Sequence, residues 1–290
     1  MNPKEIECIR KYLDSVDLVT SEIFSQKINY NEENLTVILC LLLDENSPLK
    51  EKLKYNLDEL NIDLKKYNSK LGFKLVTNEH NKHYESNYSQ ADIGFVFTIK
   101  NPEFGTKKKP MLIQCKKLYP EAEKFSLKNK YKALKVSDEQ FKEIKKLKKK
   151  KYNFCYLFYN PLFTSFFRED CMQGMQYEHS KRYGGCSTSL SNPGIKITNT
   201  ETIEYILGLD ETLSLENFYE YGTSRMFEEF SSFIIDILKC NYDIIDEESR
   251  DEQILLCEGK IVKKNVVEDY EKNPAKNTIY INYEKIEPEY

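Results

Sequence analysis

The chain has 290 residues, 40% of them hydrophobic, and a formal net charge of -4. This composition is that of a folded globular protein and excludes an intrinsically disordered one. The longest apolar run, residues 35–43, is too short to span a membrane, and the acidic start of the sequence does not resemble a signal peptide. We therefore expect a cytoplasmic protein with no membrane segment.

The N-terminal part of the sequence is predicted to be helical. Residues 4–18 carry apolar side chains at helical spacing and, with a short apolar patch at 21–28, are expected to cap the main domain. Leucines three or four residues apart over 49–64 predict a further amphipathic helical stretch, which begins at Pro48 and ends near Gly72.

Between these segments lies a helix of a different kind. Asn31 can cap it, Glu32 and Glu33 form its acidic first turn, and its body is almost wholly apolar. Such a helix belongs in the core of the domain.

Three strands are predicted next, over residues 73–77, 92–100 and 110–117. The second and third strands read as apolar on both faces, and turn-forming residues at 101–105 lie between them. The pair is therefore predicted to be two adjacent antiparallel strands of a buried sheet.

Three polar residues fall at one end of this strand pair. Asp92 opens the second strand, and Gln114 and Lys116 close the third. Because side chains alternate along a strand, Gln114 and Lys116 point to the same side. Buried charge without a partner is costly, so this cluster indicates either an ion-pair network or an active site.

The next elements complete a recognisable order. Ser137 to Gln140 has the pattern of a capping box before a lysine-covered helix, and residues 152–159 form a dense apolar strand. From residue 32 to 160 the predicted order is helix, strand, strand, strand, helix, strand.

The cluster of Asp92, Gln114 and Lys116 and the αβββαβ order of the elements both resemble the restriction-endonuclease-like PD-(D/E)xK nuclease superfamily. Asp92 takes the place of the first acid, with Ala91 where the nominal proline would stand. Gln114-Cys115-Lys116 takes the second motif in the glutamine form of Mrr-like enzymes. The resemblance implies an α/β fold with a central mixed sheet flanked by helices, and hydrolysis of DNA phosphodiester bonds with Mg²⁺ or Mn²⁺.

The resemblance also implies roles for these residues. Asp92, the amide oxygen of Gln114 and the backbone carbonyl of Cys115 would be metal ligands, since Mg²⁺ prefers oxygen. Lys116 would orient water or help deprotonate it, and would stabilise charge. The glutamine lacks one negative charge of the usual acid, so the metal site needs a second acid, and Glu32 or Glu33, in the place of the superfamily's helical glutamate, would be that ligand.

Each of these assignments has a structural alternative. Asp92 beside Lys116 would also be explained by an ion pair, although buried pairs stabilise little. Glu32 and Glu33 are equally the first-turn acids that a helix dipole favours. Gln140 resembles a glutamine on the following helix of some relatives, but capping with Ser137 explains it as well.

Charge is spread unevenly along the chain. Between residues 106 and 151 lysines outnumber acidic residues by twelve, whereas after residue 200 acidic residues exceed basic ones by thirteen. Clustered lysines bind the phosphate backbone of nucleic acids without regard to base sequence. The alternative explanation is that these lysines only form a solvent-exposed face. The nucleic-acid-binding candidates are Lys107, Lys108, Lys109, Lys117, Lys145, Lys148 and Lys149.

The last part of the chain carries no recognisable motif. We expect a nuclease-like domain with its helical cap over residues 1–165, and an acidic α+β extension over 166–290. Within the extension, residues 218–240 are predicted to be helical, and 254–267 and 278–286 to form a terminal β-hairpin.

Cysteine and histidine usage gives no metal signature. The eight cysteines are scattered without a CxxC pair, several within apolar strings, and are predicted to be structural thiols. His80 and His83 lie in a polar stretch and are expected to be loop residues.

Partners and rival functions follow from the same features. Nucleases without a visible specificity module resemble effectors of restriction or antiphage systems that a partner ATPase or sensor controls, and the sequence has no P-loop of its own. Cutting both DNA strands would favour a homodimer. The rivals are an inert nucleic-acid-binding module that keeps the nuclease fold, and a protein-interaction subunit acting through its acidic half.

Overall fold

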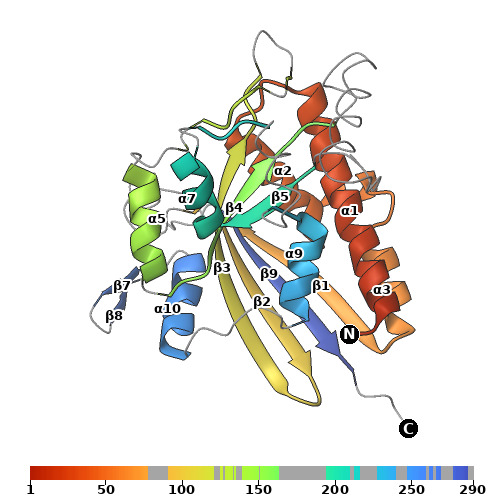
Figure 1. Cartoon of the computed structure of the whole chain (residues 1–290). Helices are drawn as coiled ribbons and strands as arrows, with labels where there is room; N and C mark the ends of the chain where they lie inside the picture. The colour runs from red at the N-terminus through yellow and green to blue at the C-terminus, as the bar shows by residue number, and fades with distance from the viewer. Residues whose placement is uncertain are drawn as a thin grey trace, which may run out of the picture.

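The structure is a computed structural model of the whole chain (Figure 1). It describes residues 1–77, 91–120, 125–126, 128–132, 134, 139–149, 151–162, 194–209, 212–215, 227–239, 247–258, 261–263, 266–268 and 277–286. In this part the chain is a mixed α/β protein with a seven-stranded mixed sheet and seven α-helices.

The central sheet has the strand order β1-β9-β2-β3-β4-β5-β6. Its strands are β1 (Ser69–Thr77), β2 (Ile93–Asn101), β3 (Gly105–Lys117), β4 (Phe154–Tyr159), β5 (Lys196–Asn199), β6 (Glu228–Glu229) and β9 (Asn277–Lys285). The predicted pairing of β2 with β3 is confirmed, as an antiparallel ladder in which Ile93 lies opposite Ile113. The predicted order of helix, three strands, helix and strand is also confirmed.

Helices cover both faces of the sheet (Figure 1). They are α1 (Pro3–Gln26), α2 (Glu32–Leu43), α3 (Leu57–Lys65), α5 (Glu139–Lys149), α7 (Thr200–Leu209), α9 (Phe230–Leu238) and α10 (Glu247–Cys257), with a 3-10 turn η1 (Pro48–Lys52). Helix α10 approaches so closely that a Cβ at Gly94 would lie 2.6 Å from the carbonyl oxygen of Cys257. The apolar runs of β2, β3 and β4 are buried because helices lie against both sides of them.

The helical predictions were right in type and wrong in extent. Residues 3–26 form one helix, α1, where two segments were expected. The helical stretch expected from Pro48 to near Gly72 is divided into η1 and α3, because Asn56 caps α3 with its side chain and ends the preceding segment, and its last residues belong to β1 instead. The helix predicted for 218–240 is confirmed over Phe230–Leu238 and is wrong at Glu228–Glu229, which form β6; residues 218–226 and 240 lie outside the described part. Asn31 caps α2 as predicted.

The predicted terminal β-hairpin is wrong. Residues 254–257 belong to α10, and a separate two-stranded ribbon is formed by β7 (Ile261–Lys263) and β8 (Val266–Glu268). Strand β9 lies between β1, to which it is antiparallel, and β2, to which it is parallel. An apolar alternation indicates a strand without naming its partner, so this long-range pairing could not be predicted. Strands from both sides of residue 165 therefore share one sheet.

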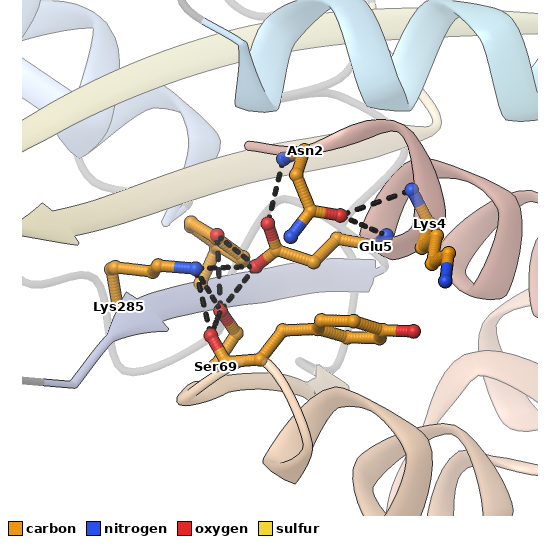
Figure 2. Close-up of polar contacts among 7 residues, drawn as sticks. Asn2, Lys4, Glu5, Ser69 and Lys285 are labelled. Carbon is orange, nitrogen blue, oxygen red and sulfur yellow. Dashed lines mark hydrogen bonds and ion pairs between the residues drawn. The ribbon is translucent and has the colours of Figure 1, made fainter. Parts of the chain in front are cut away.

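A buried polar network joins the two ends of the chain (Figure 2). Glu5, in the first turn of α1, accepts hydrogen bonds from the backbone N–H of Asn2 at 2.7 Å, the Tyr283 hydroxyl at 3.1 Å and Lys285 Nζ at 2.9 Å, as well as from the Ser69 hydroxyl. The network fixes the start of α1 to β1 and β9. It thereby holds the outer strands of the sheet in place.

No helix in the described residues combines the length and the apolar character that crossing a membrane would require.

Candidate active site

Asp92 lies directly before β2 and is tied to β3 through its backbone and its side chain. Its N–H donates to the carbonyl oxygen of Ile113 at 2.9 Å. Its Oδ2 accepts two hydrogen bonds, from Gln114 Nε2 at 2.5 Å and from the backbone N–H of Cys115 at 2.7 Å. The antiparallel pairing of β2 and β3 thus brings together residues that are more than twenty positions apart in the sequence.

The side-chain amide of Gln114 lies between two oxygen atoms. Besides its bond to Asp92, Gln114 Nε2 lies 3.3 Å from the carbonyl oxygen of Cys115, and the side chain is only 2% exposed. The carboxylate, the amide and the carbonyl therefore converge, as the sequence predicted for a metal site. A half-turn of the amide about its last bond would exchange its nitrogen for its oxygen and give three converging oxygens.

This donor set fits a hard cation that retains other ligands. Mg²⁺ is commonly held by one or two carboxylates, with waters and substrate phosphates completing the octahedron. Within the described residues no three His, Cys, Asp or Glu side chains lie close enough to hold a metal ion. Asp92, Gln114 and the Cys115 carbonyl would therefore bind Mg²⁺ together with water or phosphate, not as a closed protein cage.

Glu32, not Glu33, faces Lys116 from the first turn of α2. Glu32 Oε2 lies 3.9 Å from Lys116 Nζ, and the Lys116 residue is only 3% exposed. Glu33 is exposed. The sequence left the choice open because both positions suit the first turn of a helix, and the packing of α2 against the sheet decides it.

The electrostatic setting of Glu32 makes its charge state adjustable. Burial raises the pKa of its carboxyl group, and the charge of Lys116, the backbone N–H of Lys117 and the hydroxyl of Tyr119 oppose that shift without cancelling it. A carboxyl with a raised pKa beside a buried amine is typical of groups that exchange protons in catalysis.

Tyr159 and Thr36, which sequence reasoning missed, hold Glu32 in place. The hydroxyl of Tyr159, on β4, donates to Thr36 Oγ1 at 3.1 Å, and Thr36 donates to the carbonyl oxygen of Glu32 at 2.8 Å. Tyr159 also contacts Cys115 Sγ at 3.5 Å. Nothing in the sequence signals these contacts, because they depend on β4 lying next to β3.

The thiol of Cys115 has no part in the polar cluster. It is fully buried on the opposite side of β3 from Gln114, and burial raises its pKa well above the usual range. Cys115 therefore meets Asp92 and Gln114 through its backbone N–H and carbonyl oxygen.

Lys117 lies close to the cluster, but its ammonium group is bound by the protein itself. Its Nζ donates to the carbonyl oxygens of Tyr30 at 2.5 Å and Ile28 at 3.5 Å, and the residue is 4% exposed. Burial lowers the pKa of this amine, against the charge of Glu32 that raises it. This geometry fixes the loop before α2 and makes Lys117 a poor candidate for direct contact with DNA.

The lysines of the β2–β3 turn lie at the other end of the strands. Lys107 lies seven positions before Gln114 along β3, roughly 23 Å of extended chain. This lysine cluster therefore lies on the strand that carries Gln114 and Lys116, but at its opposite end. Lys107 lies over the ring of Phe104 and Lys108 is exposed, whereas Lys109 is buried and contacts the carbonyl oxygen of Ile237 at 3.5 Å, near the end of α9.

The predicted lysines of α5 are divided between contact and solvent. Lys145 forms an ion pair with Glu204 of α7, so one contact between the basic region and the acidic half is present. Lys149 is exposed. The side chains of Lys148 and Gln140, as well as Ser137, His80 and His83, lie outside the described residues.

No protein-family model, curated protein or solved structure matches the chain. What can be said of its function therefore rests on the geometry of this site.

Proposed function

We propose that the protein is a Mg²⁺-dependent nuclease of the PD-(D/E)xK type, with a restriction-endonuclease-like core, that hydrolyses DNA phosphodiester bonds. The observation that carries the proposal is the convergence of the Asp92 carboxylate, the Gln114 amide and the Cys115 carbonyl beside the Lys116 and Glu32 pair. A purely structural ion pair requires neither the amide nor the carbonyl at that point.

The metal ion, Lys116 and Glu32 would have different roles in hydrolysis. When bound, Mg²⁺ would supply positive charge to the phosphate and lower the pKa of a water molecule. The ammonium group of Lys116 stabilises the negative charge that grows on the phosphate oxygens, and it acts strongly because it is buried. The Glu32 carboxylate takes the proton of the attacking water, while the oxygen of that water forms the new bond to phosphorus and the bond to the leaving oxygen breaks.

A second candidate is the inert nucleic-acid-binding module. It is favoured by the hydrogen bonds that already satisfy Gln114, because its amide must turn before it can offer an oxygen to a metal. In that case the cluster would only fasten the start of β2 to β3.

The test is cleavage of supercoiled plasmid and linear DNA with Mg²⁺ or Mn²⁺ by the wild type and by Asp92→Asn and Lys116→Met. Each variant should lose about 100-fold or more in rate, because each removes charge from the transition state. Glu33→Gln, on the exposed side of the same helical turn, is the matched control and should cut at the wild-type rate.

Mn²⁺ binding to the wild type and to Asp92→Asn, measured by electron paramagnetic resonance, separates the two candidates. Binding that needs Asp92 supports the nuclease. A wild type that neither cuts nor binds Mn²⁺, or an Asp92→Asn variant that cuts at full rate, overturns the proposal. A role in restriction or antiphage defence under a partner ATPase or sensor stays a prediction from the family resemblance.

A further inference from the structure

Three lysines alternate with buried residues in the segment that follows β3. Lys128, Lys130 and Lys132 are exposed, whereas Asn129 and Tyr131 between them are buried. We call these three lysines the lysine row. They are not among the lysines that the charge pattern of the sequence selected, because no helix or hairpin loop marks them.

Backbone pairing on both sides fixes the lysine row. On one side Leu118 pairs with Tyr131 in an antiparallel bridge, and the N–H of Tyr119 donates to the carbonyl oxygen of Lys130 at 3.1 Å. On the other side Lys130 pairs with Ser214, again in an antiparallel bridge. The segment is thus part of the folded body, continuous with the end of β3.

The orientation of the row follows from Tyr131. Its ring packs against Phe158 with ring centroids 4.9 Å apart, and its hydroxyl bonds Asn160 at 2.5 Å, so it points inward. Side chains alternate along an extended segment, so Lys130 and Lys132 point outward.

The row reaches the candidate active site through one aromatic ring. The bridge register sets Lys132 opposite Lys117, and the ammonium groups of Lys132 and Lys117 lie 4.3 and 4.6 Å from the centroid of the Tyr119 ring. The Tyr119 hydroxyl in turn hydrogen-bonds to Glu32. The phenol ring of Tyr119 therefore links the ammonium group of Lys132 to the carboxyl group of Glu32, which faces Lys116.

The lysine row adds positive charge to a corner where Glu32 already faces Lys116 and Lys117. None of the three lysines of the row forms an ion pair with a described carboxylate. Like charges that lie opposite each other on neighbouring strands destabilise the fold. The contacts of Lys117 and Lys132 with the ring of Tyr119 offset this cost only in part. A surface that gathers cations in this way attracts a polyanion.

We propose that the lysine row binds the phosphate backbone of a DNA strand and leads that strand to the site at Asp92 and Lys116. The inference rests on the proposed nuclease function and names the substrate-binding surface that belongs to it. Lys130 and Lys132 are two residues apart on the bridged segment, where an extended chain repeats roughly every 6.6–6.8 Å, a spacing that suits phosphates along one strand, and Lys128 adds positive charge from the turn before them. Lysine offers point charges without the planar fork of arginine, so the contact is expected to ignore base sequence.

The test is DNA binding under conditions that exclude cleavage. Fluorescence anisotropy with a labelled DNA duplex and single strand, in chelator without Mg²⁺, compares the wild type with the triple variant Lys128→Gln, Lys130→Gln, Lys132→Gln. The matched control is Lys65→Gln, Lys70→Gln, Lys74→Gln, which removes three exposed lysines from the end of α3 and from the outer strand β1. Circular dichroism verifies that both triple variants are folded.

The row variant should bind DNA about 10-fold or more weakly, and the slope of log affinity against log salt concentration should fall by roughly 2–3, near one per lost phosphate contact. The control should change affinity less than about threefold. Equal effects in both triple variants overturn the inference, as does binding of the wild type to anionic phosphatidylserine vesicles without binding to DNA.

Binding and cleavage report separately on the two proposals. If the row variant loses DNA binding while wild type with Mg²⁺ never cuts, the lysine row stands and the nuclease assignment fails. If wild type cuts and the row variant binds DNA as tightly as wild type, the nuclease assignment stands and the lysine row is wrong.

Discussion

Glu5 and Glu32 both lie in the first turn of a helix, and both face the ammonium group of a lysine on a strand of the central sheet. Their electrostatic states are nevertheless opposite. The pKa of Glu5 is lowered, whereas the pKa of Glu32 is raised. Burial raises the pKa of both carboxyl groups; the hydrogen bonds and the lysine charge outweigh it at Glu5 and do not outweigh it at Glu32.

The partners of Glu5 saturate its carboxylate. Burial alone would raise its pKa, but the N–H of Asn2, the Ser69 hydroxyl and Lys285 donate hydrogen bonds that outweigh the burial, as Figure 2 displays. Lys116, in contrast, is 3.9 Å from Glu32, beyond hydrogen-bond length. A buried acid and lysine in proximity are therefore not a sign of function. The number of short hydrogen bonds to the charged form separates a structural carboxylate from one that can exchange a proton.

The largest effect is expected from removing the charge of Glu32. Glu32→Gln should lower the rate of DNA cleavage about 100-fold or more, because the carboxylate that takes the proton of water is lost. Its thermal unfolding at neutral pH should remain cooperative, with a midpoint at or above that of the wild type, because ionisation of the buried carboxyl costs stability. Plasmid cleavage and calorimetry measure the two effects. Wild-type cleavage by this variant would mean that Glu32 is as structural as Glu5.

Removing the charge of Glu5 should act on stability instead. Glu5→Gln is expected to cost about 2–3 kcal/mol of unfolding free energy, since buried donors lose a charged acceptor while Lys285 stays partly solvated. Urea denaturation measures this loss. Glu7→Gln, exposed on the same helix, is the control and should stay within about 0.5 kcal/mol of wild type. A similarly small effect at Glu5 would contradict a structural role for the network.

The smallest expected effect is the pH dependence of the free energy of unfolding, and its sign is opposite for Glu5 and Glu32. The lowered pKa of Glu5 contributes stability that is present above its ordinary pKa near 4.5 and is lost as the pH falls through the folded value. The raised pKa of Glu32 does the reverse, so its ionisation costs stability as the pH rises above 4.5.

Urea denaturation between about pH 3 and 7 tests both signs, because the Glu5 effect lies below 4.5 and the Glu32 effect above it. The deficit of Glu5→Gln relative to wild type should shrink toward acid pH, while the stability of Glu32→Gln relative to wild type should rise toward neutral pH. Parallel curves for the two variants would show that the two carboxyl groups have the same environment.

Local sequence patterns were enough to predict the strands β2, β3 and β4 and the order of the elements around them. Each of these strands is a short apolar run bounded by polar or turn residues, and strand alternation then places Gln114 and Lys116 on one side. The turn between β2 and β3 also fixed their pairing, so the meeting of Asp92 with Gln114 and Cys115 followed from neighbouring segments alone.

What only the tertiary structure decided depends on contacts between segments far apart in the chain. The sequence could not choose Glu32 over Glu33, place β9 between β1 and β2, or show that Lys107 and Lys132 lie at opposite ends of β3. Strand alternation and helix capping are properties of a few neighbouring residues, so they can be read from the sequence. Which carboxylate is buried beside which amine is set by the packing of α2, the sheet and the segment around Lys130, and hydrogen bonds and burial at those contacts determine the chemistry.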